Sequence, residues 1–293
     1  MTGQAEIVVD GHNLLGEGVV WSPAHGQVQW VDIIGRKFWT FQPSTGAVRA
    51  VELPERLACF APLGQLRIVA GFASGLAYFD LETGAREPIA AIEADRPTTR
   101  LNDGKLDRQG RLVFGTMDEA KTGAEPIGQV WSLAAGSPPQ VLFSGVRISN
   151  SIAFSPDGRR MYFADTPLRT IFCFDYDGER GAVANRRVFA QTAEGGGYPD
   201  GSTVDSEGCL WNAEWDGGRV VRYTPDGRID RVVALPCSRA TCCAFGGADL
   251  ATLFVTSAAG GLDDKRRAAE PHAGALFAVN VGVRGLADAP FGG

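Results

Sequence analysis

The chain has little of the histidine and thiol chemistry that hydrolases commonly use. Its 293 residues include only three histidines, His12, His25 and His272. They are too scattered to predict a three-histidine zinc site or a nucleophile–histidine pair. The six cysteines form no C-x-x-C pair and have no histidine at zinc-finger spacing. We therefore expect reduced, buried cysteines that act as small apolar residues.

Basic charge, long apolar runs and helical periodicity are also lacking. Lys and Arg number 28 against 34 Asp and Glu, for a net charge of −6 and a pI near 5.2, which argues against nucleic acid or an anionic membrane as partner.

No apolar run approaches about 18 residues and the start has no signal-peptide pattern, so we expect a cytoplasmic protein. No apolar period of 3.6 residues persists over three turns. The charged run "DDKRR" at 263–267 is interpreted as a solvated loop.

Glycine is abundant instead, with 38 residues and no collagen period, which predicts many tight turns and short strands. Apolar runs follow glycines at spacings of 38, 46, 48 and 50, and a sixth run begins at Ala248. The five glycines are Gly26, Gly64, Gly110, Gly158 and Gly208. Most of these units continue into a further alternating strand and a turn.

Six units of about 40–50 residues, each with about four strands, match the repeat of a β-propeller. We predict an all-β fold, a six-bladed β-propeller with four antiparallel strands per blade, as one domain over 1–293. Residues 5–10 are expected to add an outer strand to the last blade and to close the ring, which removes a free edge. An open β-sandwich is the alternative, but it does not predict six equivalent units.

One of the repeated turn tripeptides has an unusual place. Pro-Asp-Gly occurs at 156–158, 199–201 and 225–227, and the first and last copies are typical of hairpin turns. Asp200, Asn150 and Asn102 each lie eight residues before a repeat glycine, and Glu17 lies nine before Gly26, a difference that one bulged residue accounts for. The equivalent places in the second and sixth units are Arg56 and the vicinity of Cys242.

In a propeller, the starts of equivalent inner strands surround one mouth of the central channel. Two carboxylates and two amides meeting there form a set of hard oxygen ligands, which predicts one divalent cation: Ca²⁺, Mg²⁺ or Mn²⁺, with Zn²⁺ or Fe²⁺ as alternatives. Each residue taken alone is equally consistent with a turn or cap role at a strand entrance. Arg100, Asn102 and Asp103 are expected close together at the same mouth, and the polar segment 118–128 is either a lid or an idle loop.

Five stretches resemble the gluconolactonase family, also called the SMP-30, regucalcin or luciferin-regenerating family, and within it the bacterial sugar lactonases. They are "LGEGVVWSP" (15–23), "RLNDGKLDRQGRLVFGTMD" (100–118), "ISNSIAFSPDGRRMYFADT" (148–166), "YPDGSTVDSEGCLWNAEW" (198–215) and "CCAFGGADLATLFVTSA" (242–258). The resemblance implies a six-bladed propeller that binds one divalent ion and opens an aldonolactone such as glucono-, galactono-, xylono- or arabinonolactone. The implied partner is thus a small-molecule sugar lactone, and a monomer is the default state.

By motif, the resemblance implies that Glu17, Asn150 and Asp200 bind the metal and that Asp200 also accepts and donates the catalytic proton. Arg100 and Asn102 are implied to contact substrate, and we add Asp103 and Glu119 to that set. Asp118 and Glu119 are both counterparts of the acidic lid residue that the family often places after "GTM". Ser151 departs from the family, in which Gly often follows the ligand Asn.

The leading prediction is metal-dependent hydrolysis of a sugar lactone, with Asp200 moving the proton and no triad required. One alternative is a propeller that binds metal or another ligand without turnover. Another is an esterase or phosphotriesterase, since such enzymes also use a divalent ion in a propeller.

Overall fold

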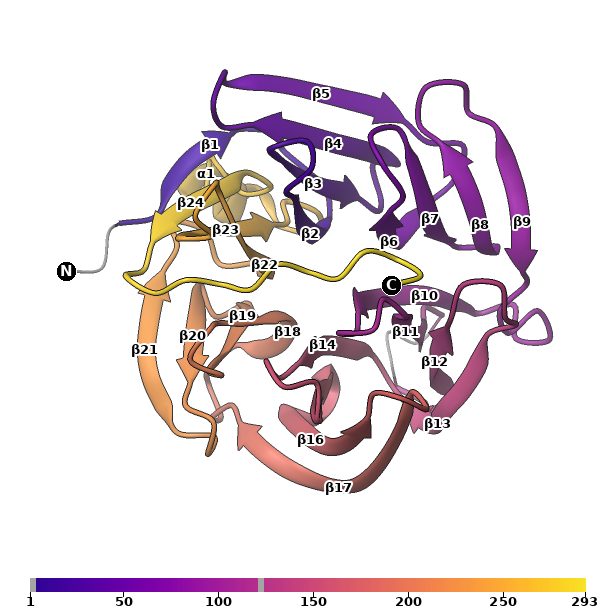
Figure 1. Cartoon of the computed structure of the whole chain (residues 1–293). Coiled ribbons are helices and arrows are strands. Elements are labelled where there is room, and N and C mark those ends of the chain that lie inside the picture. Colours follow the sequence, from indigo (N-terminus) through magenta and orange to yellow (C-terminus); the bar gives the residue numbers. More distant parts are fainter. Residues whose placement is uncertain (1–3, 121–123) are drawn as a thin grey trace. The chain divides into compact units, whose positions relative to one another are not determined.

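The computed structural model describes residues 4–120 and 124–293. The chain forms two compact units, one of Met1–Arg56 with Thr192–Ala287 and one of Leu57–Gln191 with Asp288–Gly293. Each unit contains three four-stranded antiparallel sheets, and most of their strands are labelled in Figure 1.

The first unit holds the first, fifth and sixth sheets. The first sheet consists of β2 (Gly16–Ser22), β3 (Gln27–Asp32), β4 (Lys37–Gln42) and β5 (Ala47–Glu52). The fifth consists of β18 (Tyr198–Val204), β19 (Leu210–Trp215), β20 (Arg219–Tyr223) and β21 (Ile229–Ala234). The sixth has the order β22 (Ala240–Gly246), β23 (Thr252–Ser257), β24 (Leu276–Asn280) and β1 (Glu6–Val9).

The second unit holds the second, third and fourth sheets. The second consists of β6 (Leu57–Pro62), β7 (Arg67–Phe72), β8 (Gly75–Asp80) and β9 (Arg86–Ala90). The third consists of β10 (Thr99–Leu106), β11 (Leu112–Asp118), β12 (Gly128–Leu133) and β13 (Gln140–Val146). The fourth consists of β14 (Ser149–Phe154), β15 (Arg160–Asp165), β16 (Thr170–Asp177) and β17 (Ala182–Gln191).

Five sheets of four consecutive antiparallel strands, and a sixth that combines β22–β24 with β1, confirm the predicted class, an all-β six-bladed β-propeller. The N-terminal strand completes the sixth sheet, as predicted, by pairing with β24 through Glu6–Ala278 and Ile7–Phe277. Val9 of this strand is buried, and it packs in a core cluster with Trp30 and Leu276. A chain end thereby covers an edge that would otherwise leave backbone groups unpaired.

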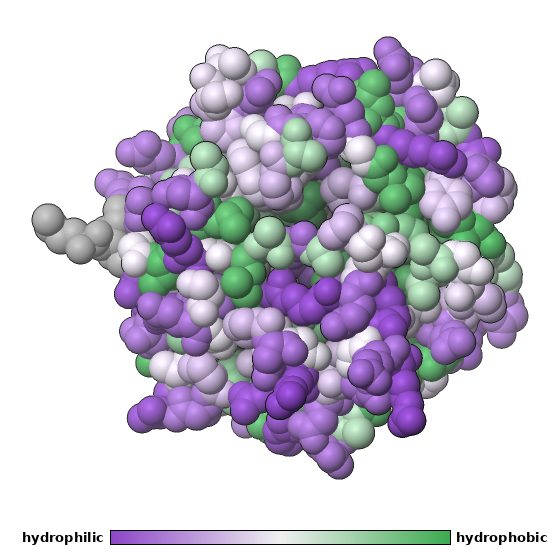
Figure 2. All heavy atoms as spheres, viewed as in Figure 1, coloured by the Kyte–Doolittle hydropathy of each residue, from purple (hydrophilic) through white to green (hydrophobic). Residues whose placement is uncertain are grey.

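Burial falls from the first strands of each sheet to the fourth, which explains the sequence pattern of each. Every residue of β11 and β14 is buried, and neither strand shows a regular alternation of apolar and polar residues. The fourth strands β5 and β13 are mostly exposed. Their large apolar side chains are single residues such as Val48 and Val141, and polar and apolar residues are interspersed over the face seen in Figure 2.

The first strand of every sheet carries a β-bulge at the place where the site residues were predicted. The register shifts by one residue between Glu17 and Val20, Leu101 and Gly104, Asn150 and Ala153, and Pro199 and Ser202. It also shifts between Leu57 and Cys59 and between Ala240 and Cys243. An extra residue bends the strand and re-aims its side chains, so each bulge changes the direction of the side chains predicted for the site.

In the first and fourth sheets, an aspartate at the end of the second strand binds the backbone just before the bulge of the first strand. Asp32 accepts hydrogen bonds from the N–H groups of Leu14 and Leu15, at 2.9 and 3.0 Å. Asp165 accepts from those of Arg147 and Ile148 in the same way, at 3.1–3.3 Å. In both sheets the bonded N–H groups belong to the residues three and two before the site residue, Glu17 or Asn150. A carboxylate thus replaces ladder bonds that the irregular backbone cannot make.

One local prediction is wrong. Asp264–Ala269 forms a short helix, α1, where we expected a loop, because Asp263 caps it by accepting from the Arg266 N–H at 2.8 Å.

All six cysteines are buried, as predicted. Over residues 4–120 and 124–293, no helix has the length and apolar character needed to cross a membrane.

Candidate active site

Asp200 differs from the aspartates of the two other Pro-Asp-Gly copies, as predicted. Asp157 and Asp226 lie in turns, where they accept hydrogen bonds from Ser155 and Thr224, two residues before each. Asp200 lies instead inside β18 and is 5% exposed. The tripeptide is the same in all three places, so the bulge and the neighbouring strands set the role of Asp200.

Glu17 and Asp200, in the first unit, flank the same strand. β22 contacts both β2 and β18, and Figure 1 shows it between them. The Thr241 hydroxyl donates to the Gly16 carbonyl, beside Glu17. A Cβ placed on Gly201, beside Asp200, would lie 2.6 Å from the Cys242 sulfur. The bulge of β22 therefore packs against both acidic positions, in agreement with the expectation of Cys242 as the equivalent place in the sixth unit.

Asn212 holds the bulge of β18 from the neighbouring strand β19. Its Nδ2 donates to the Asp200 carbonyl at 2.9 Å and to the Ser202 hydroxyl at 3.0 Å, and the side chain is fully buried. The backbone of Asp200 is thus fixed by a side chain that sequence reasoning did not identify. Nothing in the repeat spacing distinguishes this residue from other polar residues of a central strand.

In the second unit, Arg100, Asn102 and Asn150 are joined by hydrogen bonds, and all three are buried. Arg100 Nη1 donates to Asn102 Oδ1 at 2.7 Å. Asn102 Nδ2 donates to Asn150 Oδ1 at 3.0 Å and to the Ser149 carbonyl at 2.9 Å. The structure therefore brings together three of the predicted site residues, and it links the bulges of β10 and β14 through them.

Asp103 makes a second link between these bulges. Its Oδ2 accepts from the Ile152 N–H at 2.8 Å, and the side chain is buried. Burial raises the pKa of the Asp103 carboxyl to about 6, although the Ile152 N–H and the positive charge of Lys105 act in the opposite direction. This contact gives Asp103 a structural role, and its role in substrate binding stays a prediction.

The two candidate acidic lid residues have different environments. Asp118 is buried at the end of β11, where it accepts from the Ala120 N–H at 3.2 Å. Glu119 is about one-third exposed and accepts from Arg100 Nε at 3.0 Å. Of the two, Glu119 is the one joined to the Arg100 network. Residues 121–123, in the middle of segment 118–128, which was expected to be either a lid or an idle loop, lie outside the described residues.

Strand pairing shows that the four predicted residues occupy two different positions relative to the bulge. Glu17 and Asn150 are the last paired residues before the bulge, whereas Asn102 and Asp200 are the first residues beyond the last pair. The prediction of one equivalent position is therefore correct only to within one residue. In the second sheet the bulge lies at Ala58, two residues after the predicted Arg56.

The residue after each of the two paired ligand candidates has a left-handed backbone. Gly18, after Glu17, has φ 60°, and Ser151, after Asn150, has φ 57°. Glycine adopts this conformation without penalty, whereas a residue with a Cβ is strained there. Ser151 thus stands at a position whose geometry favours the family's glycine.

Glu17, Asn150 and Asp200 fit a divalent cation by the chemistry of their side chains. They are 9%, 5% and 5% exposed and supply two carboxylates and one amide oxygen, a hard oxygen set. Asn150 Nδ2 donates to Thr166 Oγ1 at 2.9 Å, and the amide oxygen is the atom of this group with the chemistry of a cation ligand. Among the described residues, no group of three or more His, Cys, Asp or Glu side chains could hold a metal ion. The present set contains only two such side chains, because its third member is an asparagine.

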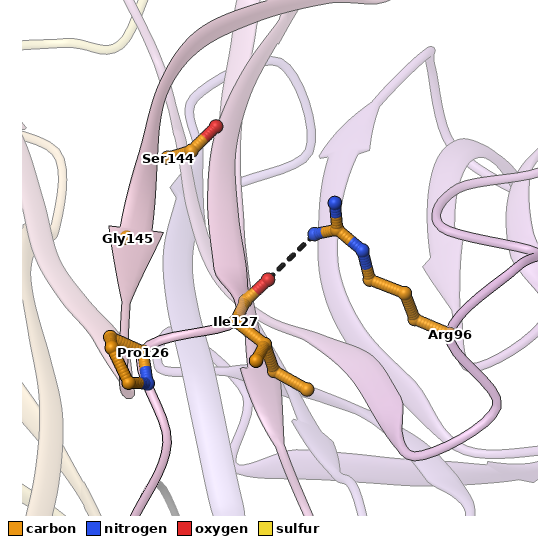
Figure 3. Close-up of a pocket in the computed structure, with 5 residues that line it drawn as sticks. All are labelled: Arg96, Pro126, Ile127, Ser144 and Gly145. Carbon is orange, nitrogen blue, oxygen red and sulfur yellow. Dashed lines mark hydrogen bonds between the residues drawn. The ribbon is translucent and has the colours of Figure 1, made fainter.

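A separate hollow of about 360 Å³ lies at one end of the third sheet. Figure 3 shows its lining residues, with the Arg96 guanidinium donating to the Ile127 carbonyl at 2.6 Å. Its lining residues, Arg96, Pro126, Ile127, Ser144 and Gly145, include none of the predicted site residues. Glu93 and Asp95 lie 3.7 and 4.0 Å from Arg96, so its charge is already balanced.

Comparison with known proteins identifies the family. Residues 15–259 match the SMP-30/gluconolactonase/LRE-like region. The chain belongs to this family. It is 43% identical to the L-arabinolactonase of Azospirillum brasilense, over 99% of this chain and 96% of that protein. It is 35% identical to the 6-deoxy-6-sulfogluconolactonase of Pseudomonas putida, over the full length of both.

Solved structures support the same assignment. The crystal structure of a calcium-binding protein, regucalcin, from Agrobacterium tumefaciens matches with a TM-score of 0.93 and 32% identity. The alignment covers 99% of this chain and 97% of that one. The SMP-30/gluconolactonase resemblance predicted from the motifs is thereby confirmed.

Proposed function

We propose that this protein is a lactonase that hydrolyses an aldonolactone to the open-chain sugar acid, with one divalent cation bound by Glu17, Asn150 and Asp200. Membership of the family and the lactonase relatives support the activity. The observation that carries the assignment to residues is the bulge in β18, which buries Asp200 beside β22.

Lactone opening needs little beyond activation of water and of the carbonyl. A divalent cation supplies Lewis acidity toward the carbonyl oxygen and lowers the pKa of water. Asp200 accepts a proton from the water that attacks the carbonyl carbon. The bond from that carbon to the ring oxygen then breaks, and Asp200 returns the proton to the ring oxygen. The product is a carboxylic acid with a free hydroxyl.

Arg100 and Asn102 are proposed to orient the lactone, as the family resemblance implies. Their hydrogen bonds to each other and to Glu119 hold the guanidinium in one place. A fixed donor placed before substrate arrives contributes through positioning, because little side-chain freedom remains to be lost on binding. Glu119 supports this pair by accepting from Arg100, and Asp103, the residue after Asn102, ties the same bulge to the Ile152 N–H.

A pentonolactone is the first substrate to test, because the relative that is 43% identical is an arabinolactonase. We expect L-arabinono-, xylono-, galactono- and gluconolactone to be hydrolysed faster than they open spontaneously. The reaction is followed by acid release at constant pH. Activity should be lost in chelator and restored by Ca²⁺, Mg²⁺, Mn²⁺, Zn²⁺ or Fe²⁺.

Replacing the proposed proton carrier tests the assignment. Asp200→Ala should lower lactone hydrolysis by at least about 10²-fold, because a general base contributes roughly 10²–10⁴-fold. Asp226→Ala is the matched control, since it removes the aspartate of another Pro-Asp-Gly copy from an exposed turn. Equal activities of the two folded variants in saturating metal would refute the role of Asp200.

The same assays distinguish the alternatives. A binding protein without turnover would gain thermal stability from the cation and leave every lactone unchanged. An esterase or phosphotriesterase would act on aryl esters or phosphotriesters in preference to the sugar lactones.

A further inference from the structure

A chain of hydrogen-bonded side chains runs from β10 of the third sheet to the residue that follows β15 in the fourth sheet. Arg100 donates to Asn102, Asn102 donates to Asn150, and Asn150 donates to the hydroxyl of Thr166, at 2.7, 3.0 and 2.9 Å. Thr166 lies just beyond β15, and its backbone N–H donates to the Ile148 carbonyl at 3.1 Å. The hydroxyl is therefore held opposite Asn150 by backbone bonding.

The direction of these hydrogen bonds is set at the Arg100 end. A guanidinium has donors and no acceptor, so Asn102 must face it with Oδ1 and present Nδ2 to the next residue. Asn150 must then face Asn102 with Oδ1, which leaves its Nδ2 for Thr166. Reversing either amide would bring two donors or two acceptors together in a buried place, where an unsatisfied polar group is costly.

We propose that Thr166 is a positioning residue for the cation: it binds the amide nitrogen of Asn150, so that the amide oxygen stays turned toward the ion. Asn150 Oδ1 has two lone pairs. Asn102 uses one, and the second is available to a cation. This inference rests on the proposed function, because it assumes that Asn150 is a ligand.

The residue equivalent to Thr166 in the first sheet has no hydroxyl group. In the first sheet the residue at the same place, after the clamping Asp32, is Ile33, and its N–H donates to the Leu15 carbonyl at 2.9 Å. The ligand candidate there is Glu17, a carboxylate whose two oxygens are both acceptors, so its orientation needs no such partner. An amide has one oxygen and one nitrogen. Asn102 determines which end is the oxygen, and the Thr166 hydroxyl accepts from Nδ2 at the other end and holds the side chain in that position.

The test replaces the hydroxyl without changing the shape. Thr166→Val removes the acceptor and keeps the branched side chain, whereas Thr166→Ser keeps the hydroxyl. We expect Thr166→Val to weaken Ca²⁺ and Mn²⁺ binding by about 10-fold or more, as loss of a partner that orients a ligand commonly does. Thr166→Ser should bind within about twofold of wild type. Binding is measured by calorimetric titration, and far-ultraviolet circular dichroism verifies the fold.

The outcomes separate this inference from the proposed function. Wild-type affinity in Thr166→Val, with binding abolished in Asn150→Ala, would overturn the role of Thr166 and leave the metal site standing. Equal weakening in both Thr166 variants would also overturn it, because the hydroxyl would then not be the cause. A wild-type protein that binds neither Ca²⁺ nor Mn²⁺ would refute both the inference and the proposed calcium or manganese site.

Discussion

At the scale of single residues, the site combines ordinary polar groups with an unusual backbone. Asn150, one of the three proposed ligands, precedes a serine whose φ of 57° favours glycine. Its counterpart Glu17 precedes Gly18, for which φ of 60° carries no steric penalty. The strain at Ser151 is tolerated because the bulge around it is tied to β10 by Asn102 and to the Ile152 N–H by Asp103.

The first prediction concerns this strain. Ser151→Gly removes the Cβ that conflicts with the left-handed backbone, and Ser151→Ala keeps it, while both remove the hydroxyl. We expect the Gly variant to be more stable than the Ala variant by about 1 kcal/mol, measured by urea unfolding. An Ala variant as stable as the Gly variant would show that the bulge does not strain this residue.

The residues of the site were more accessible to sequence reasoning than their partners were. The repeat offset selected Glu17, Asn102, Asn150 and Asp200 because glycine turns are local signals that can be counted from the sequence. Asn212 and Thr166 were missed because their roles depend on strand pairing: Asn212 is paired with Ser202 and reaches the Asp200 carbonyl, and Thr166 follows β15 and reaches the Asn150 side chain. Which residues face each other across a bulged pair of strands cannot be found by counting along one strand.

At the scale of elements, the link between β10 and β14 determines how firmly the site is built. Asn102 and Asp103 are consecutive, and each bonds to the bulge of the neighbouring sheet. The carboxylate of Asp103 is buried and its pKa is raised to about 6. The Asp103 carboxyl therefore changes its protonation state near pH 6.

The second prediction is a pH dependence of stability. The folded pKa of Asp103 lies above the ordinary value of about 3.9, so the folded state holds this proton more tightly than the unfolded state does. The resulting stabilisation is complete below pH 4 and is lost as pH rises through about 6. Relative to Asp103→Asn, wild type should lose on the order of 2–3 kcal/mol of unfolding free energy between pH 4 and pH 7.

Urea unfolding at four pH values, in chelator so that no cation contributes, measures this difference. Other carboxyls titrate equally in both proteins, and they cancel in the comparison. Asparagine can still accept from the Ile152 N–H, so the variant keeps the link between the strands. Parallel stability curves for the two proteins would show that Asp103 does not carry the pH dependence.

Element boundaries show where sequence reasoning worked and where it did not. The glycine-led runs predicted β3, β7, β11, β15 and β19, because alternating apolar residues after a turn are sufficient to define a buried strand. The helix α1 was missed because six residues are too few to show a 3.6-residue period. Its signal was the cap residue Asp263, followed by the good helix formers Lys, Arg and Ala.

At the scale of the whole molecule, the proposed ligands come from both compact units. Glu17 and Asp200 belong to the first unit, and Asn150 belongs to the second. The sequence predicted that residues 17 to 200 would meet, because six equivalent repeats imply a ring.

The third prediction tests whether one cation is bound by residues of both units. At about 100 times its Kd, an ion that binds only the folded state adds about 2.7 kcal/mol of stability, so chelator should lower the melting temperature by roughly 5 °C or more. Glu17→Ala and Asn150→Ala should each abolish this shift, since each removes a ligand from a different unit. Asp226→Ala should keep the full shift. A shift that survives in Asn150→Ala would mean that the first unit binds the ion by itself, and the proposed ligand set would then be wrong.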